Sequence, residues 1–158
     1  MGIDPSKFKS CGFLQSFSPD ELAFILEISS EENYPAGSTI FREGDTNSDL
    51  FLLIKGEADV DINVPTEDTE VNIHVVPEGS VFGHFSFIDR QPRSATIKAK
   101  SDIRVLRISR KDFDVFKLKQ PFLALHLIEA LTSTISQAIR GENVFLQSFL
   151  DYRAISVG

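Results

Sequence analysis

The stretch from Gly79 to Thr96 reads GSVFGHFSFIDRQPRSAT, and the rest of the chain is organised around it. Gly83 can adopt backbone angles closed to other residues and can let a ligand approach the main chain. Residues 84–89 are predicted to form one short helical turn, whose first N–H groups lack helical partners and attract anions. Pro92 fixes the backbone before Arg93, a permanent cation whose planar fork fits two phosphate oxygens. The spacing predicts a pocket for one phosphate on a small ligand with an apolar face.

Composition limits the classes of function that the chain can serve. With 158 residues, the chain can form a domain with a real hydrophobic core. Its net charge of −7 disfavours non-specific binding to nucleic acid or to acidic membranes. Cys11 is the single cysteine, so no disulfide forms within the chain, which fits a reducing cytoplasm. There is no charged and apolar leader and no run of 18 apolar residues, so we expect neither secretion nor a membrane span.

A short helix is predicted before the strands begin. Ser18 is placed as its N-cap, Pro19 stands in the first turn, and Glu21 completes a capping box. We expect the helix to end near residues 29–30 and a turn to follow at residues 34–37. The apolar face of this helix comprises Leu22, Ile25 and Leu26.

Short strands separated by turns follow, as is typical of an antiparallel sandwich or barrel. The segment 58–64 alternates apolar and polar residues, which predicts a half-buried strand with Asp59 and Asp61 on its solvated face. Val71, Ile73 and Val75 should form the apolar face of the return strand. The remaining strands are predicted at residues 39–42, 50–54, 95–99 and 103–108.

Two helices are predicted to close the chain. Ser109 caps the first, whose Phe113 and Phe116 should face the sheets. The second begins at Pro121 and is interrupted at Gly141. Its apolar stripe is too long to be covered by a small β domain, so we expect a partner. The stripe comprises Leu123, Leu127, Ile128, Leu131, Ile135, Ala138 and Ile139, and it resumes at Phe145, Leu146, Phe149 and Leu150.

The opening stretch resembles the phosphate-binding cassette of the cyclic nucleotide-binding domain family. The family pattern is roughly Phe-Gly-Glu, a short helix, and then Pro-Arg-Ser/Ala-Ala-Thr. The residues that match are Phe82, Gly83, Pro92, Arg93, Ser94, Ala95 and Thr96. His84 stands where the family has a glutamate that accepts the ribose 2′-hydroxyl.

The resemblance runs from about Phe13 to Phe116 and implies a fold. That fold is mainly β with flanking helices: an antiparallel β-roll of the double-stranded β-helix or jelly-roll kind, with a short N-terminal and a long C-terminal helix. The implied domains are a flexible N-terminus at 1–12, the roll at 13–119, and a helical lid or dimerisation segment at 120–158.

The resemblance also implies a ligand, cAMP or cGMP, with no other cofactor. Arg93 would pair with the cyclic phosphate, and the N–H groups of His84, Phe85 and Ser94 would donate to its oxygens. The implied ligand-binding residues are Phe82, Gly83, His84, Phe85, Ser86, Arg93, Ser94 and Ala95. The candidate base contacts are Val81 and, on the C-terminal helix that caps the base in relatives, Arg140 and Asn143. For His84 three interpretations stay open: it contacts ribose or phosphate, it marks a pocket that no longer binds, or it faces away.

The leading hypothesis is a cytoplasmic cyclic nucleotide-binding regulatory module, with cAMP favoured over cGMP. Ligand would close the C-terminal helix and signal to a partner, either a second copy bound through that helix or a fused or separate effector. The alternative is a ligand-free interaction or dimerisation domain with the same fold. Metal-dependent catalysis of the cupin type needs a His-X-His motif and a downstream glutamate, which the sequence lacks, so we expect no enzyme and no metal site. The net charge of −7 leads us to expect no nucleic-acid partner.

Overall fold

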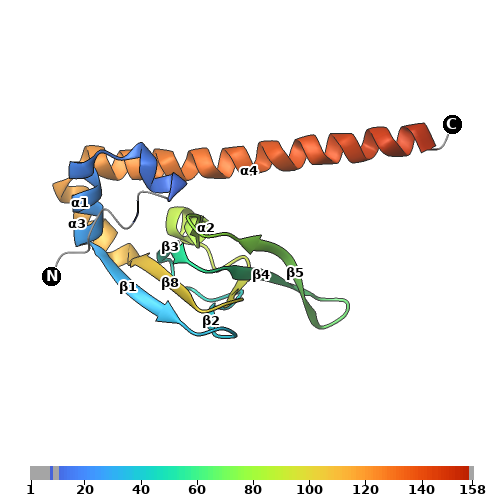
Figure 1. Cartoon of the computed structure of the whole chain (residues 1–158), viewed down its shortest axis with the longest axis horizontal. Helices are drawn as coiled ribbons and strands as arrows, with labels where there is room; N and C mark the ends of the chain where they lie inside the picture. The colour runs from blue at the N-terminus through green and yellow to red at the C-terminus, as the bar shows by residue number, and fades with distance from the viewer. Residues whose placement is uncertain (1–7, 9–10, 157–158) are drawn as a thin grey trace. The chain divides into compact units, whose positions relative to one another are not determined.

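Strands from distant parts of the chain pair into two four-stranded antiparallel sheets, with the orders β1-β8-β3-β6 and β2-β7-β4-β5 (Figure 1). The structure is a computed structural model, and it describes Phe8 and residues 11–156. It confirms the predicted β-roll with a short N-terminal and a long C-terminal helix. The strands are β1 Ser29–Tyr34, β2 Thr39–Phe41, β3 Leu50–Lys55, β4 Ala58–Val64, β5 Thr69–Val76, β6 Val81–Phe82, β7 Thr96–Ala99 and β8 Ile103–Ile108. The helices are the 3-10 helix η2 Gly12–Ser16 and the α-helices α1 Pro19–Glu27, α2 His84–Asp89, α3 Arg110–Lys119 and α4 Pro121–Ser156.

The hydrophobic core draws on both sheets. Phe51 of β3 and Phe82 of β6 stack with their ring centroids 5.1 Å apart, and Phe41 of β2 lies 5.8 and 6.1 Å from them. Aromatic pairs at these separations add to the stabilisation from burial. The buried cluster comprises Phe41, Phe51, Leu53, Ala58, Val76, Phe82, Ile97, Ala99, Ile103 and Val105.

The start of the chain is only partly described. Phe8 and Cys11 are 2% and 1% exposed, and burial, followed by the charge of Glu78, raises the pKa of the Cys11 thiol. A buried thiol with a raised pKa is unreactive, as expected for a spare cysteine. The other residues of the predicted flexible segment 1–12, apart from Gly12, lie outside the described part of the chain.

The predicted capping box of α1 is confirmed, because Ser18 Oγ accepts from the Glu21 N–H and the Glu21 carboxylate accepts from the Ser18 N–H. The predicted end of this helix was wrong. It ends at Glu27, and β1 follows at once, pairing with β8 at the edge of its sheet. The sequence of β1, SSEENY, is polar because an edge strand leaves much of its surface in water, so it shows no apolar alternation.

The predicted faces of the β4–β5 hairpin were wrong in two places. Val71 and Ile73 of β5 are 42% and 55% exposed, because β5 is an edge strand whose residues 69–74 are exposed on both faces. Asp61, expected in water, is 9% exposed, since the Asn72 amide donates to it at 3.0 Å and Lys98 lies 3.3 Å away.

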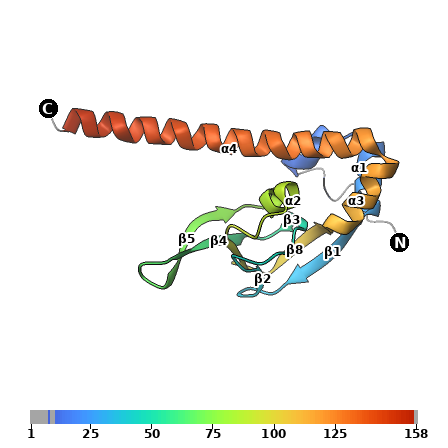
Figure 2. The same ribbon diagram turned by 180° about the vertical axis from the view of Figure 1, so that it is seen from behind.

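Helices α1 and α3 lie side by side in both views of the roll (Figures 1 and 2). Ser109 caps α3 as predicted, accepting from the Asp112 N–H at 3.0 Å. The predicted inward residues Phe113 and Phe116 are 2% and 5% exposed. Phe113 packs against Phe87 of α2, with ring centroids 4.9 Å apart, so α3 is tied to the cassette helix.

The chain divides into two compact units, Met1–Ala124 and Leu125–Gly158, and the domain limit predicted at residues 119–120 stays a prediction. Helix α4 continues through Gly141, so the predicted interruption there was wrong. A single glycine costs only about 1 kcal/mol in a helix, which its helix-forming neighbours offset. The predicted continuation of the apolar stripe from Phe145 to Leu150 concerns side chains outside the described part of the chain.

Residues Pro121–Asn143 of α4 are long and apolar enough to cross a membrane by length and composition, with a mean hydropathy of 1.3. No span was expected from the sequence, because this segment contains scattered charges and no uninterrupted run of 18 apolar residues. One such helix is weak evidence, since helices of soluble proteins also meet this criterion.

Candidate functional site

Within the cassette, Gly83 forms a left-handed turn, with a φ of +76°, directly before α2. A Cβ atom at this position would lie 2.8 Å from Arg93 Nη1 and 3.0 Å from the Asp49 carbonyl oxygen. Both the backbone angle and the lack of space therefore require glycine. Helix α2 then spans the residues predicted for the short helical turn.

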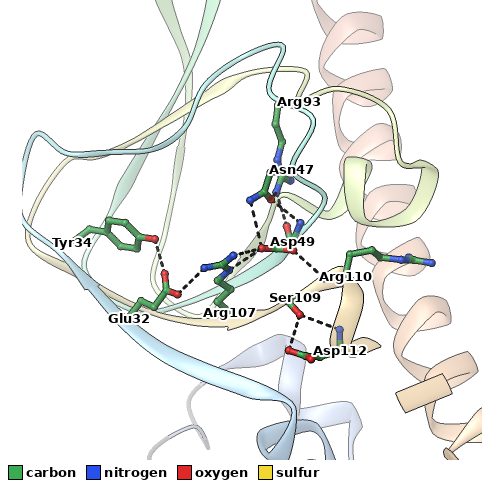
Figure 3. Close-up of polar contacts among 9 residues, drawn as sticks. All are labelled: Glu32, Tyr34, Asn47, Asp49, Arg93, Arg107, Ser109, Arg110 and Asp112. Carbon is green, nitrogen blue, oxygen red and sulfur yellow. Dashed lines mark hydrogen bonds and ion pairs between the residues drawn. The ribbon is translucent and has the colours of Figure 1, made fainter. Parts of the chain in front are cut away.

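Arg93 is folded into the protein rather than extended into water. Its side chain is 3% exposed, and its guanidinium carbon lies 4.0 Å above the centre of the Phe41 ring. Nη1 donates to the Gly83 carbonyl at 2.9 Å. Nη2 donates to Asn47 Oδ1 at 2.7 Å and to the Asp49 carbonyl at 2.8 Å (Figure 3). These contacts fix the guanidinium at one place beside the start of α2.

The charge of Arg93 is not neutralised within the part of the chain that the structure describes. No carboxylate there forms an ion pair with it, and its buried Nε–H has no acceptor. Burial lowers the pKa of Arg93 to about 10, against the opposing charges of Asp49 and Asp45. A buried cation with an unused donor is costly, and an anion placed beside it would remove that cost.

His84, the first residue of α2, carries a second unused polar atom. Its Nδ1 is buried without a hydrogen-bond partner, and its ring packs on Phe85 with centroids 4.7 Å apart. Burial lowers the pKa of the imidazole below 6.5, so the ring is neutral at pH 7. The Gly83 carbonyl, which accepts from Arg93 Nη1, belongs to the residue directly before His84, so Arg93 reaches the start of α2 where His84 lies.

The other predicted ligand-binding residues differ in how far a ligand can reach them. Phe82 belongs to the core, and Val81 and Ser86 are buried. Phe85 is 51% exposed, Ser94 is exposed and Ala95 is half-buried. Arg140 and Asn143 are exposed residues of the second unit, and their contact with a base stays a prediction.

Sequence reasoning missed the residues outside the cassette that accept hydrogen bonds from Arg93. Asn47 and Asp49 lie 46 and 44 residues before Arg93, in the loop that leads into β3, and Phe41 ends β2. The one local signal was that these polar residues directly precede the apolar run 50–54. Their contact with Arg93 depends on the pairing of the sheets, which no local pattern records.

Comparisons with known proteins identify the family of the chain. The family model described as "Cyclic nucleotide-binding domain" matches residues 31–119. A cAMP-dependent protein kinase regulatory subunit of Aspergillus niger is 38% identical over 100 residues, which cover 63% of this chain and 23% of that protein. The human cGMP-dependent protein kinase 2 is 32% identical over 107 residues, which cover 67% of this chain and 14% of that protein. The chain thus matches less than a quarter of the length of these relatives.

A solved structure of similar shape is the cyclic nucleotide-binding domain from Methylobacillus flagellatus, with a TM-score of 0.80. The two sequences are 23% identical, and the matched region covers 89% of this chain and 82% of the Methylobacillus flagellatus chain. At this identity, the likeness shows the fold alone.

Proposed function

The chain belongs to the cyclic nucleotide-binding domain family, and we propose that it is a regulatory module that binds cAMP at the cassette. The observation that carries the proposal is the buried guanidinium of Arg93, which has an unused Nε–H and no ion pair in the described part of the chain. A cyclic phosphate supplies the missing negative charge.

The phosphate is held from two sides in this proposal. Arg93 contributes a charged hydrogen bond, worth roughly 1.5–3 kcal/mol, or about ten- to a hundredfold in affinity. The N–H groups of His84 and Phe85 have no helical acceptor because they begin α2, so they can donate to the phosphate oxygens. Neutral His84 can accept a hydrogen bond from a sugar hydroxyl, more weakly than a carboxylate would.

The choice of cAMP over cGMP is supported by the relatives. The regulatory subunit that is 38% identical is named for cAMP, while the kinase named for cGMP is 32% identical. Ser94, whose hydroxyl could reach either a phosphate or a guanine amino group, does not distinguish the two bases.

The binding energy is proposed to move α4 over the nucleotide and so signal to a partner in the cytoplasm. The partner is a second copy bound through α4 or an effector. A ligand shifts such an equilibrium only by its different affinities for the two states. In this role the chain is regulatory and not catalytic, like the kinase regulatory subunit named above.

Calorimetric titration with cAMP and cGMP tests the proposal. Wild-type protein should bind cAMP more tightly than cGMP, and Arg93→Ala should weaken cAMP binding about ten- to a hundredfold. Arg42→Ala, which removes an exposed arginine, is the control and should bind as wild type. The proposal would be refuted if folded wild-type protein showed no heat of binding during titration with millimolar cAMP or cGMP.

A second candidate is a domain that keeps the fold but binds no nucleotide. The observation that favours it is His84, since the family pattern has a glutamate there. His84→Glu separates the candidates. If it produces tight binding where wild type shows none, the pocket is intact but wild type does not use it for cyclic nucleotide.

A further inference from the structure

Asp49 contacts two arginines in different ways. Its backbone carbonyl accepts from Arg93 Nη2 at 2.8 Å, whereas its carboxylate is used elsewhere. Oδ2 accepts from Arg107, with 2.8 Å to Nε and a shorter contact to Nη2, and Oδ1 accepts from the Arg110 N–H at 2.9 Å (Figure 3). In the described part of the chain the Asp49 carboxylate therefore pairs with Arg107 and the Arg110 N–H and forms no ion pair with Arg93.

Arg107 is held in place from its other side. It lies on β8, opposite Ser30 of β1 and Phe51 of β3. Its Nη1 donates to Glu32 Oε1 at 3.0 Å, and Glu32 Oε2 accepts from the Tyr34 hydroxyl at 2.6 Å (Figure 3). Two carboxylates thus fix one guanidinium, so Arg107 is a rigid partner for Asp49.

We propose that Arg107 is a positioning residue, which keeps the Asp49 carboxylate away from Arg93 and so leaves the Arg93 charge available to an anionic ligand. Asp49 is only 8% exposed, and a carboxylate at such a site needs a charged partner. Without Arg107, a cation that remains beside Asp49 is Arg93, whose Nη2 already touches the Asp49 backbone. An internal Asp49–Arg93 ion pair would then compete with the phosphate.

The role in ligand binding rests on the proposed function, but the competition between the two arginines for Asp49 exists without ligand. Two readouts therefore separate the two ideas. The first is the NMR resonance of the Arg93 Nε–H in the ligand-free protein. The second is calorimetric titration with cAMP.

The test compares Arg107→Met, which keeps the apolar stem, with the double variant Arg107→Met/Asp49→Asn. An asparagine can still accept from the Arg110 N–H through its Oδ1 but cannot pair with Arg93 as an anion. In Arg107→Met we expect the Arg93 Nε–H resonance to shift and the Kd for cAMP to rise about tenfold, the size of one charged hydrogen bond. The double variant should restore the resonance and bring the Kd to within about threefold of wild type.

Arg104→Met is the matched control, because Arg104 also lies on β8 and pairs with Glu31 at 3.4 Å. It should change neither readout. If Arg107→Met leaves both readouts unchanged, or if the double variant restores neither, the inference is wrong while the proposed function stands. If the resonance responds as predicted but wild type does not bind cAMP, the proposed function fails and the competition for Asp49 is upheld.

Discussion

Arg93 Nη1 donates to the Gly83 carbonyl at 2.9 Å, and this hydrogen bond joins the chain before α2 to the chain after it, across ten residues. Gly83→Ala should break this arrangement, because a Cβ there requires a strained φ and meets Arg93 Nη1 at 2.8 Å. We expect a loss of about 2 kcal/mol in the free energy of unfolding. Urea unfolding measures it, and wild-type stability in this variant would contradict the described turn.

Gly141→Ala should act in the opposite direction. The glycine lies within α4 and has open space where a Cβ would stand. Alanine in a helix interior is favoured over glycine by up to about 1 kcal/mol. Helicity and thermal stability measured by circular dichroism should both rise. A decrease in either would contradict a continuous helix at Gly141 and support the interruption predicted from the sequence.

His84 should make stability depend on pH. Burial lowers its pKa in the folded protein below the 6.5 of the unfolded chain, so the unfolded state binds more protons between these two values. Stability should therefore be lost as the pH falls below about 6.5 and through the folded pKa. Unfolding measured from pH 7.5 to pH 5 should show a shallower decline in His84→Gln than in wild type. Equal slopes would mean that the imidazole is not desolvated.

Asp114 should tie α3 to the cassette helix through Arg90. The hydrogen bond from Lys117, with help from Arg90 and Arg110 and against desolvation, lowers the pKa of Asp114 from 3.8 to about 2. Its contribution is present above pH 3.8 and is lost as the pH falls through about 2. Because the carboxylate is partly exposed, we expect Asp114→Asn to cost only about 1 kcal/mol at neutral pH.

Unfolding at pH 7 and in the range between pH 4 and pH 2 measures this effect. Wild type should lose its advantage over Asp114→Asn across that acidic range. A constant difference between the two proteins at all pH values would show that the charge of Asp114 contributes nothing.

The sequence was most informative where local chemistry decides the structure. The glycine turn at Gly83, the short helix after it and the capping box at Ser18 all depend on residues within a few positions of one another. Strand β1 was missed because a polar edge strand has no apolar alternation, and Gly141 misled because a long helix tolerates one glycine.

Only those residues of the site that lie close together in the sequence were predicted. Arg93 could be found from its spacing to Gly83, but its placement depends on Asn47 and Asp49, more than forty residues earlier. The exposure of Val71 and Ile73 depends on the edge position of β5, which the sequence does not mark. Contacts set by the pairing of distant strands need the structure.

The most direct test of the central claim is the NMR resonance of the Arg93 Nε–H during titration with cAMP, with adenosine as the ligand that lacks a phosphate. The account predicts that cAMP shifts this resonance in a saturable way and that adenosine does not, because the unused donor meets the phosphate. A resonance that stays in place while cAMP saturates the protein would contradict it, since the nucleotide would then bind away from Arg93.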